Sequence, residues 1–442
     1  MLGRSIVLID GEHYPEVVRD TIASLGREVV GAAFLGGAEK IESGALPDYG
    51  LPVAGGVDPE AALVAALEEF HPDEVIDLSD EPVVSSRLRF RLAARALLSG
   101  ASYRGADFLL RPPPRPRVLT KPSVAVIGTG KRVGKTAVAA EAARTFAAAG
   151  SHPVIVAMGR GGPQEPEIIP QGRGLDARSL LDLANSGRHA ASDYLEDALS
   201  TGLTTVGARR CGGGLAGAPF SSNVVEAARL ADGLGDLVIL EGSGAAIPPV
   251  HADATLLVAE AGSARECFHD YLGPYRLLLS DLVILTMCEE PVADGRRLSA
   301  VESSIRQISR DCAYLRTIFR PFPLEDVTGC RVLYATTAPE SAGSRLRAHL
   351  EEHFGATVVA TSHRLADRAG LRADLSKARG SYEVLLTELK AAAVDVGARQ
   401  VLAEGVRVVF CDNQLVALDG KQALEQALSR IATLARERAG NS

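Results

Sequence analysis

The stretch GTGKRVGKT, residues Gly128–Thr136, decides how the chain folds around it. It follows a short apolar run, Val124–Ile127, and precedes the helix-forming segment Ala137–Ala149. A strand, a glycine-rich loop and a helix in this order bring backbone N–H groups, a helix N-terminus and one lysine onto a polyphosphate. We therefore predict a phosphate-binding loop here. The alternative is an ordinary strand–helix turn followed by a surface Lys-Thr pair.

The residue types within this loop assign its contacts. We expect Lys135 to reach the β- and γ-phosphates of ATP and the Thr136 hydroxyl to bind Mg²⁺. Thr129 stands where the standard pattern has glycine, and the longer G-x5-G-K-T spacing resembles the dethiobiotin-synthetase-like branch of P-loop enzymes. The predicted nucleotide-binding residues are Gly128, Thr129, Gly130, Lys131, Arg132, Val133, Gly134, Lys135, Thr136 and Ala137.

The bulk composition is that of a globular chain with no basic excess. It has 442 residues, 46% of them hydrophobic and 23% charged, and a formal net charge of −8, which argues against nucleic acid as a partner. Its six cysteines are scattered, and no apolar stretch approaches the roughly 18–20 residues that span a bilayer. We expect a cytoplasmic protein that binds a small anionic phosphorylated substrate, with no nucleic-acid or membrane partner.

Proline divides the chain into two α/β parts. The segment RPPPRPR, residues Arg111–Arg117, cannot be regular helix or central strand, so we predict a linker over residues 111–118. The fold class is then an N-terminal Rossmann-like or flavodoxin-like parallel-sheet domain, residues 1–110, followed by a larger P-loop NTPase α/β domain, residues 119–442. A C-terminal α/β extension is expected from about residue 340.

Short apolar runs bounded by turn signals predict the strands of this larger domain. They are Ser123–Ile127, Pro153–Met158, Asp236–Leu240, Thr255–Val258, Leu282–Thr286, Arg331–Ala335, Thr357–Thr361 and Val406–Cys411. The glycine-rich stretch Gly202–Gly217 is predicted to be a loop.

Polar residues that follow strands are the next candidates, because ligands of parallel sheets bind beyond the carboxyl ends of the strands. Arg160 and Gly161 follow one predicted strand, and arginine offers a bidentate fork for a phosphate or carboxylate. Glu241 follows another strand, where P-loop enzymes hold Mg²⁺, and Glu165 is a further candidate metal ligand. Each of these residues has the simpler alternative of a solvated turn.

Further cations extend this list. Arg209 and Arg210 lie in a glycine-rich stretch that would form an anion clamp, and Lys131 lies inside the phosphate loop, where it would stabilise a transferring phosphoryl group. Asp10 and His13 follow the first strand of the N-terminal domain, which could close one side of the cleft, although the sequence does not show which domain binds the acceptor. The predicted catalytic residues are Lys135, Lys131, Arg160 and Glu241. The predicted substrate residues are Arg160, Gly161, Arg209, Arg210, Asp10 and His13, and the predicted metal ligands are Thr136, Glu241 and Glu165.

Taken together, these motifs resemble the cyclic 2,3-diphosphoglycerate synthetase family. The segments that carry the resemblance span the chain: VLIDGEHYP, VIGTGKRVGKT, AMGRGGP, ILEGSG and LLTELKAAAVDV. The resemblance implies an enzyme that joins the two phosphates of 2,3-diphosphoglycerate into a cyclic pyrophosphate, with ATP converted to ADP and phosphate. It implies that Lys135 and Thr136 bind ATP and Mg²⁺. A homodimer is the expected assembly.

Two other functions fit the loop. A dethiobiotin-synthetase-like ligase would phosphorylate a carboxylate and close a ring through nitrogen. A nucleotide-switched partner-binding ATPase would hydrolyse ATP on contact with a partner, although the signature lysine of the partition ATPases is replaced here by Gly130.

Overall fold

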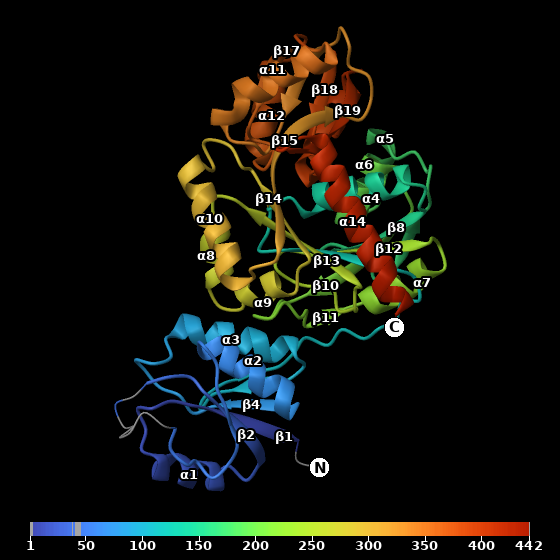
Figure 1. Ribbon diagram of the computed structural model, residues 1–442. Helices are drawn as coiled ribbons and strands as arrows, with labels where there is room; N and C mark the ends of the chain where they lie inside the picture. The colour runs from blue at the N-terminus through green and yellow to red at the C-terminus, as the bar shows by residue number, and fades with distance from the viewer. Residues whose placement is uncertain (1–2, 38, 40–45, 442) are drawn as a thin grey trace.

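The computed structural model describes residues 3–37, 39 and 46–441 and contains two β-sheets (Figure 1). The first sheet belongs to the N-terminal domain and the second runs through the rest of the molecule. This confirms the mixed α/β class with parallel sheets that the sequence predicted.

The N-terminal domain is a parallel sheet with one antiparallel edge strand. Its strand order is β3-β2-β1-β4-β5-β6, and only β6 runs antiparallel to its neighbour. The strands are β1 Arg4–Ile9, β2 Glu28–Phe34, β3 Val53–Ala54, β4 Glu74–Asp77, β5 Ser102–Arg104 and β6 Leu109–Leu110. The helices are α1 Pro15–Ser24, α2 Pro59–Phe70 and α3 Ser86–Leu98.

The second sheet begins with a parallel half that carries the phosphate loop. Its strand order is β10-β8-β12-β7-β13-β14-β15, with β11 and β9 as short antiparallel additions to β10. The strands are β7 Ser123–Gly128, β8 Pro153–Gly159, β9 Glu167–Ile169, β10 Thr205–Cys211, β11 Ser221–Ser222, β12 Leu237–Glu241, β13 Ala254–Glu260, β14 Leu282–Thr286 and β15 Ala313–Pro323. We call this half and its helices the P-loop lobe.

Helices cover both faces of the P-loop lobe, so its central strands are buried on both sides. Alternate strand residues pack on α4 and α14 on one face and on α7 to α10 on the other. The helices are α4 Lys135–Ala148, α5 Ala177–Asn185, α6 Asp193–Thr201, α7 Val224–Asp232, α8 Ala264–His269, α9 Gly273–Leu278, α10 Gly295–Ile308 and the terminal α14 Lys421–Gly440.

The second half of this sheet is another parallel unit, which we call the C-terminal lobe. Its strand order is β19-β18-β16-β17, and antiparallel pairing of β15 with β19 joins the two halves. The strands are β16 Arg331–Ala335, β17 Thr357–Ser362, β18 Val384–Thr387 and β19 Arg407–Ala417, and the helices are α11 Gly343–Phe354, α12 Arg368–Lys377, a π-helical turn Ala393–Ala398 and α13 Arg399–Ala403. The extension expected from about residue 340 therefore begins earlier, at β16.

The ribbon formed by β15 and β19 orients the two lobes. Early β15 pairs with β14, and its later part, Thr317–Pro323, pairs with β19, whose early part pairs with β18. The carboxyl ends of β14 and β18 therefore meet this ribbon at opposite ends and face each other across it. Seven residues of extended strand correspond to about 20 Å between the two strand edges.

The N-terminal domain docks on the side of the P-loop lobe that lies away from the C-terminal lobe (Figure 1). Helix α3 packs against α9, and Phe90 makes an edge-on ring contact with Tyr271. Arg95 donates to the carbonyl of Ile308, the last residue of α10, shortly before β15 begins. These contacts lie near the amino ends of the sheet strands. The described residues that line the phosphate-loop cleft belong to the P-loop lobe and the C-terminal lobe, so closure of this cleft by the N-terminal domain is not supported.

Three strands of four or more residues were not predicted as strands from the sequence. Thr205–Cys211, within the stretch predicted as loop, is strand β10, and neither β15 nor β18 was predicted. Among the described residues, no helix combines the length and the apolar character needed to span a bilayer.

Candidate active site

A cavity of about 760 Å³ lies between the P-loop lobe and the C-terminal lobe. Six residues of the phosphate loop and its helix line it: Lys131, Arg132, Gly134, Lys135, Thr136 and Ala137. The other predicted loop residues, Gly128, Thr129, Gly130 and Val133, lie outside the lining. The loop after β7 thus opens onto a space large enough for a small ligand.

Backbone conformation and close packing explain why glycine stands at position 134 of the loop. Gly134 caps α4 with φ +96°, and a Cβ there would lie 2.3 Å from the Phe319 ring. Such a positive φ is readily reached only by glycine, and the close approach excludes a side chain. On the other flank, Val133 accepts a hydrogen bond from the Thr286 hydroxyl at 2.8 Å, which ties the loop to β14.

Lys135 and Thr136 point to the same part of this space. Lys135 is buried, and its Nζ donates to the Gly130 carbonyl at 2.8 Å. Burial lowers the pKa of this lysine, although the carboxyls of Glu241 and Asp193 act in the opposite direction. The Thr136 hydroxyl donates to Oε1 of Glu241 at 2.7 Å, so the loop threonine and the acid that ends β12 are in direct contact.

Carboxylates gather behind this contact. Burial raises the pKa of Glu241 to about 7, with a further contribution from Asp193. Oε2 of Glu241 and both carboxyl oxygens of Asp197 are buried and lack a hydrogen-bond partner in the described part of the chain. Burial and the charge of Glu241 raise the pKa of Asp197 as well. Glu241 and Asp197 therefore form a buried carboxyl pair behind the phosphate loop, although no group of three or more acidic, histidine or cysteine side chains among the described residues is arranged to hold a metal ion.

Two guanidinium groups converge at the loop after β12. A Cβ on Gly244, where φ is +60°, would lie 2.9 Å from Nη2 of Arg160 and 3.2 Å from Nη2 of Arg210. Arg210 donates to the carbonyls of Gly212 and Ser243, both at 2.6 Å. The guanidinium of Arg160 makes no hydrogen bond or ion pair with the described residues. The charge of Asp193 acts on both arginines, but two like charges this close together still favour an anion between them.

Other predicted residues do not reach this cavity. Arg209 is exposed, and its backbone N–H donates to Asn223 Oδ1 at 2.7 Å. Glu165 is exposed and absent from the lining. Asp10 and His13 contact each other at 2.8 Å in the N-terminal domain, where Asp10 also accepts from the backbone of Glu12. These contacts of Asp10 stabilise its own loop, and neither Asp10 nor His13 lines the cavity at the phosphate loop. Gly161, in contrast, lines the cavity beside Arg160.

Sequence reasoning missed an acidic face on helix α6. Asp193, Glu196 and Asp197 follow the i, i+3, i+4 spacing of one helix face. Asp193 and Glu196 line the cavity, whereas Asp197 is fully buried. Burial raises the pKa of Asp193, and the charges of Lys390, Lys135, His189 and Arg160 oppose that rise. The spacing D-x-x-E-D in the sequence was the signal that could have revealed this face.

The C-terminal lobe supplies the opposite wall and links across the cavity. Lys390 contacts both carboxyl oxygens of Glu196, at 2.8 and 3.1 Å, and Arg345 contacts Glu289 at 2.6 Å. The cationic lining residues are Lys131, Arg132, Lys135, Arg160, Arg345, Arg368 and Lys390, and the acidic ones are Asp193, Glu196, Glu241, Glu289, Glu290, Glu388 and Asp412. The cavity is therefore mixed in charge rather than uniformly cationic.

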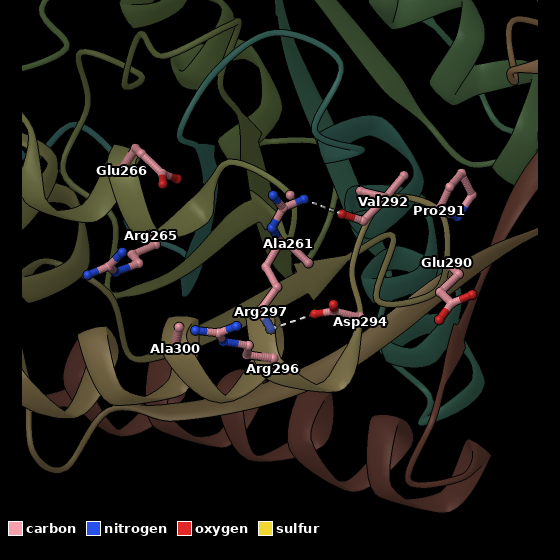
Figure 2. A pocket seen from close by; sticks show the side chains of 11 residues that line it. Ala261, Arg265, Glu266, Glu290, Pro291, Val292, Asp294, Arg296, Arg297 and Ala300 are labelled. Atoms are coloured by element: carbon pink, nitrogen blue, oxygen red, sulfur yellow. Dashed lines mark hydrogen bonds between the residues drawn. The ribbon is translucent and has the colours of Figure 1, made fainter.

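A second hollow of about 540 Å³ shares Glu290, Pro291 and Val292 with the first (Figure 2). Arg297 donates from its side chain to the Val292 carbonyl at 2.9 Å and from its backbone to Asp294 at 2.7 Å. All charged side chains that line this hollow are exposed. The phosphate loop opens onto the first cavity, which we therefore take as the candidate active site.

Comparison with known proteins agrees with this architecture. Three family models match in succession: the N-terminal domain of cyclic 2,3-diphosphoglycerate synthetase over residues 4–111, its P-loop domain over 123–318 and its C-terminal domain over 323–414. The chain belongs to the cyclic 2,3-diphosphoglycerate synthetase family. The resemblance inferred from the sequence is thus confirmed.

Relatives in this family are similar over nearly their whole length. The cyclic 2,3-diphosphoglycerate synthetase of Rubrobacter xylanophilus is 51% identical, with 99% of each chain covered. That of Methanothermus fervidus is 45% identical, with 94% of each covered. Among solved structures, LpxK from Aquifex aeolicus in complex with ATP matches 72% of this chain and 90% of its own, with 13% identity and a TM-score of 0.41. Likeness at that level carries no inference about the site.

Proposed function

We propose that this chain is an ATP-dependent synthetase that forms the intramolecular pyrophosphate of cyclic 2,3-diphosphoglycerate from 2,3-diphosphoglycerate. Membership of the family supports the reaction. The observation that carries the proposal is the convergence of the phosphate loop, with Lys135 and Thr136, and the unpaired guanidinium of Arg160 on one cavity. One set of groups suits a nucleotide and the other suits an anionic acceptor.

Within this proposal, Mg²⁺ would be held by Thr136 and Glu241. Their contact at 2.7 Å and the unpartnered Oε2 of Glu241 provide the oxygen donors that this cation prefers. Bound Mg²⁺ would neutralise charge on the β- and γ-phosphates. Glu165, which is exposed and off the cavity, is not part of the proposed ligand set.

The acceptor presents an electrostatic problem that the arginines address. Two phosphates that must react with each other repel, and each pair of unit like charges at 4 Å costs roughly 4 kcal/mol at an effective dielectric constant of 20. Arg160 and Arg210, which converge at Gly244, repel each other in the same way. An acceptor phosphate between them would relieve both repulsions, and Lys131 is placed to add charge at the phosphate loop.

The proposed path has two displacements. An oxygen of one acceptor phosphate attacks the γ-phosphorus of ATP, which forms a P–O–P bond and releases ADP. An oxygen of the other acceptor phosphate then attacks the first acceptor phosphorus, which closes the ring and expels inorganic phosphate. Lys135 and Arg160 hold the reacting groups in place and balance the charge that moves between them.

Isotope tracing tests this path. With ATP labelled by ¹⁸O at its three non-bridging γ-oxygens, all label should leave in inorganic phosphate, which gains its fourth oxygen from the acceptor. Mass spectrometry of the cyclic product should find no label. Labelled oxygen retained in the ring would contradict the path, and no ADP release with 2,3-diphosphoglycerate would contradict the function.

The expected homodimer and cytoplasmic location stay predictions. Analytical ultracentrifugation of the full chain tests the dimer directly, because a single species of one-chain mass would contradict it.

A further inference from the structure

The C-terminal lobe forms one wall of the cavity, and the proposed function has assigned no role to the side chains of that wall. Parallel strands bind ligands beyond their carboxyl ends, and here the carboxyl ends of two parallel units face each other across the β15–β19 ribbon. On the C-terminal side the lining comes from the segments that follow β16 and β18: Thr336–Pro339, Glu388 and Lys390–Ala392. This is the position at which a parallel unit holds its own ligand.

The segment after β18 is rigidly held. Oε1 of Glu388 accepts from the Thr336 hydroxyl at 2.5 Å and from the Thr337 backbone at 3.0 Å, and Oε2 accepts from the Thr337 hydroxyl at 2.8 Å. Glu388 is buried, so these bonds fix the chain two residues before Lys390. The lysine stem therefore leaves a fixed backbone and its ammonium reaches across the cavity to Glu196.

Lys390 is electrostatically near the proposed reaction centre. Asp193, one helical turn before Glu196, feels the charges of Lys390, Lys135 and Arg160 together. These three cations come from the C-terminal lobe, the phosphate loop and the end of β8, respectively. All three cations line the same cavity as Asp193, so an anion that spans this cavity would contact groups of both lobes.

We propose that the acceptor binds between the two lobes and that Lys390 is its ligand from the C-terminal lobe. This assignment rests on the proposed function and names the side of the site that holds the acceptor. Lys390 would exchange its contact with Glu196 for an anionic group of the acceptor, while the phosphate loop keeps the nucleotide. The N-terminal domain, which docks near the amino ends of the P-loop-lobe strands, contributes no acceptor ligand.

The competing explanation is that Lys390 only fastens the lobes together through Glu196. The two explanations differ in what happens when the ion pair is broken from either side. A fastening pair is lost equally in Lys390→Gln and in Glu196→Gln. An acceptor ligand is lost only in Lys390→Gln, and Glu196→Gln leaves the ammonium free for the acceptor.

The experiment is isothermal titration calorimetry of the full chain with 2,3-diphosphoglycerate and, separately, with a non-hydrolysable ATP analogue and Mg²⁺. Arg399→Gln is the matched control, because Arg399 also joins the lobes, through Asn185 at 2.7 Å, but does not line the cavity. We expect Lys390→Gln to weaken acceptor affinity roughly tenfold to a hundredfold, the range of a lost charge-assisted hydrogen bond. We expect Glu196→Gln and Arg399→Gln to keep it, and all variants to bind the ATP analogue as the wild type does.

Acceptor affinity unchanged in Lys390→Gln, or lowered equally in Glu196→Gln, would overturn the assignment. If Lys390→Gln does not fold, the double variant Lys390→Gln/Glu196→Gln removes both partners and leaves no unpaired charge, and it should show the same loss of acceptor affinity. A wild-type chain that binds the ATP analogue but not 2,3-diphosphoglycerate would overturn the proposed function as well. Failure of the assignment alone leaves wild-type acceptor binding intact.

Discussion

Lys135 is buried, and in the part of the chain that the structure describes its ammonium has one hydrogen-bond partner, a carbonyl of its own loop. Its ammonium donates to Gly130, and its pKa is lowered by burial. A cation kept under these conditions costs folding free energy, and a phosphate that takes over its hydrogen bond would recover part of that cost.

Replacement of Lys135 by methionine should therefore abolish catalysis without harming the fold. The variant keeps the aliphatic stem and removes the charge, so we expect kcat to fall by roughly 100-fold to 1,000-fold or more, as for the loss of one electrostatic donor in an active site. Steady-state ADP release measures the effect, and the variant should unfold at the same temperature as the wild type or a higher one, because the cost of the buried charge is removed. Lys121→Met, an exposed lysine outside the cavity, is the control. Full activity in Lys135→Met would show that the active site lies elsewhere.

Glu241 should make stability depend on pH in the metal-free protein. Its folded-state pKa is raised from 4.5 to about 7, so the folded state binds more protons than the unfolded state between these values. The cost of ionising Glu241 is absent below pH 4.5 and complete above pH 7, and stability should fall as pH rises through this window. Relative to Glu241→Gln, we expect a loss on the order of 2–3 kcal/mol.

Urea unfolding in EDTA at pH 5 and pH 8 measures this difference. Parallel pH profiles for the wild type and Glu241→Gln would mean that Glu241 is already ionised in the folded protein at low pH.

At the scale of elements, the loop after β12 depends on the absence of a side chain at Gly244. Alanine there would place a methyl group within 3.2 Å of both guanidinium groups and would strain a backbone at φ +60°. We expect Gly244→Ala to displace Arg160 and Arg210 and to raise the KM for the acceptor about tenfold, while the KM for ATP changes little. Gly233→Ala, at a helix end with negative φ, is the control. Equal changes in both KM values would argue against a separate acceptor clamp.

Strands were predictable where apolar runs are uninterrupted. Leu282–Thr286 and Arg331–Ala335 have the predicted bounds because they are short, buried and flanked by turn residues. Strand β10 was mistaken for loop because it contains Gly207, which is needed where Tyr194 packs: a Cβ there would lie 2.7 Å from the tyrosine ring. Strand β15 contains Pro321 and Pro323, which are tolerated because this part of the strand has β19 as its one neighbour.

The candidate site was only half predictable for a related reason. Lys135, Thr136, Glu241 and Arg160 follow strands within one parallel unit, where a local motif predicts position. Lys390 lines the same cavity because the β15–β19 ribbon places the C-terminal lobe opposite the P-loop lobe. No local pattern in the sequence indicates that the two lobes face each other.

For the whole molecule, the arrangement of lobes predicts where ligands protect the backbone. In hydrogen–deuterium exchange, the ATP analogue with Mg²⁺ should slow exchange over residues 128–137 and 241–244. The acceptor should slow exchange over residues 336–339 and 388–392. Residues 10–15 of the N-terminal domain should exchange at the same rate with either ligand, because that domain docks at the amino ends of the strands. Strong acceptor protection of residues 10–15 would contradict this arrangement.

The central claim is that ATP occupies the phosphate loop and the acceptor lies between the P-loop lobe and the C-terminal lobe. A crystal structure of the full chain with a non-hydrolysable ATP analogue, Mg²⁺ and 2,3-diphosphoglycerate tests it most directly. The account predicts the triphosphate on residues Gly128–Thr136 and the acceptor in contact with Arg160 and Lys390. A triphosphate bound elsewhere, or an acceptor seated in the N-terminal domain, would contradict it.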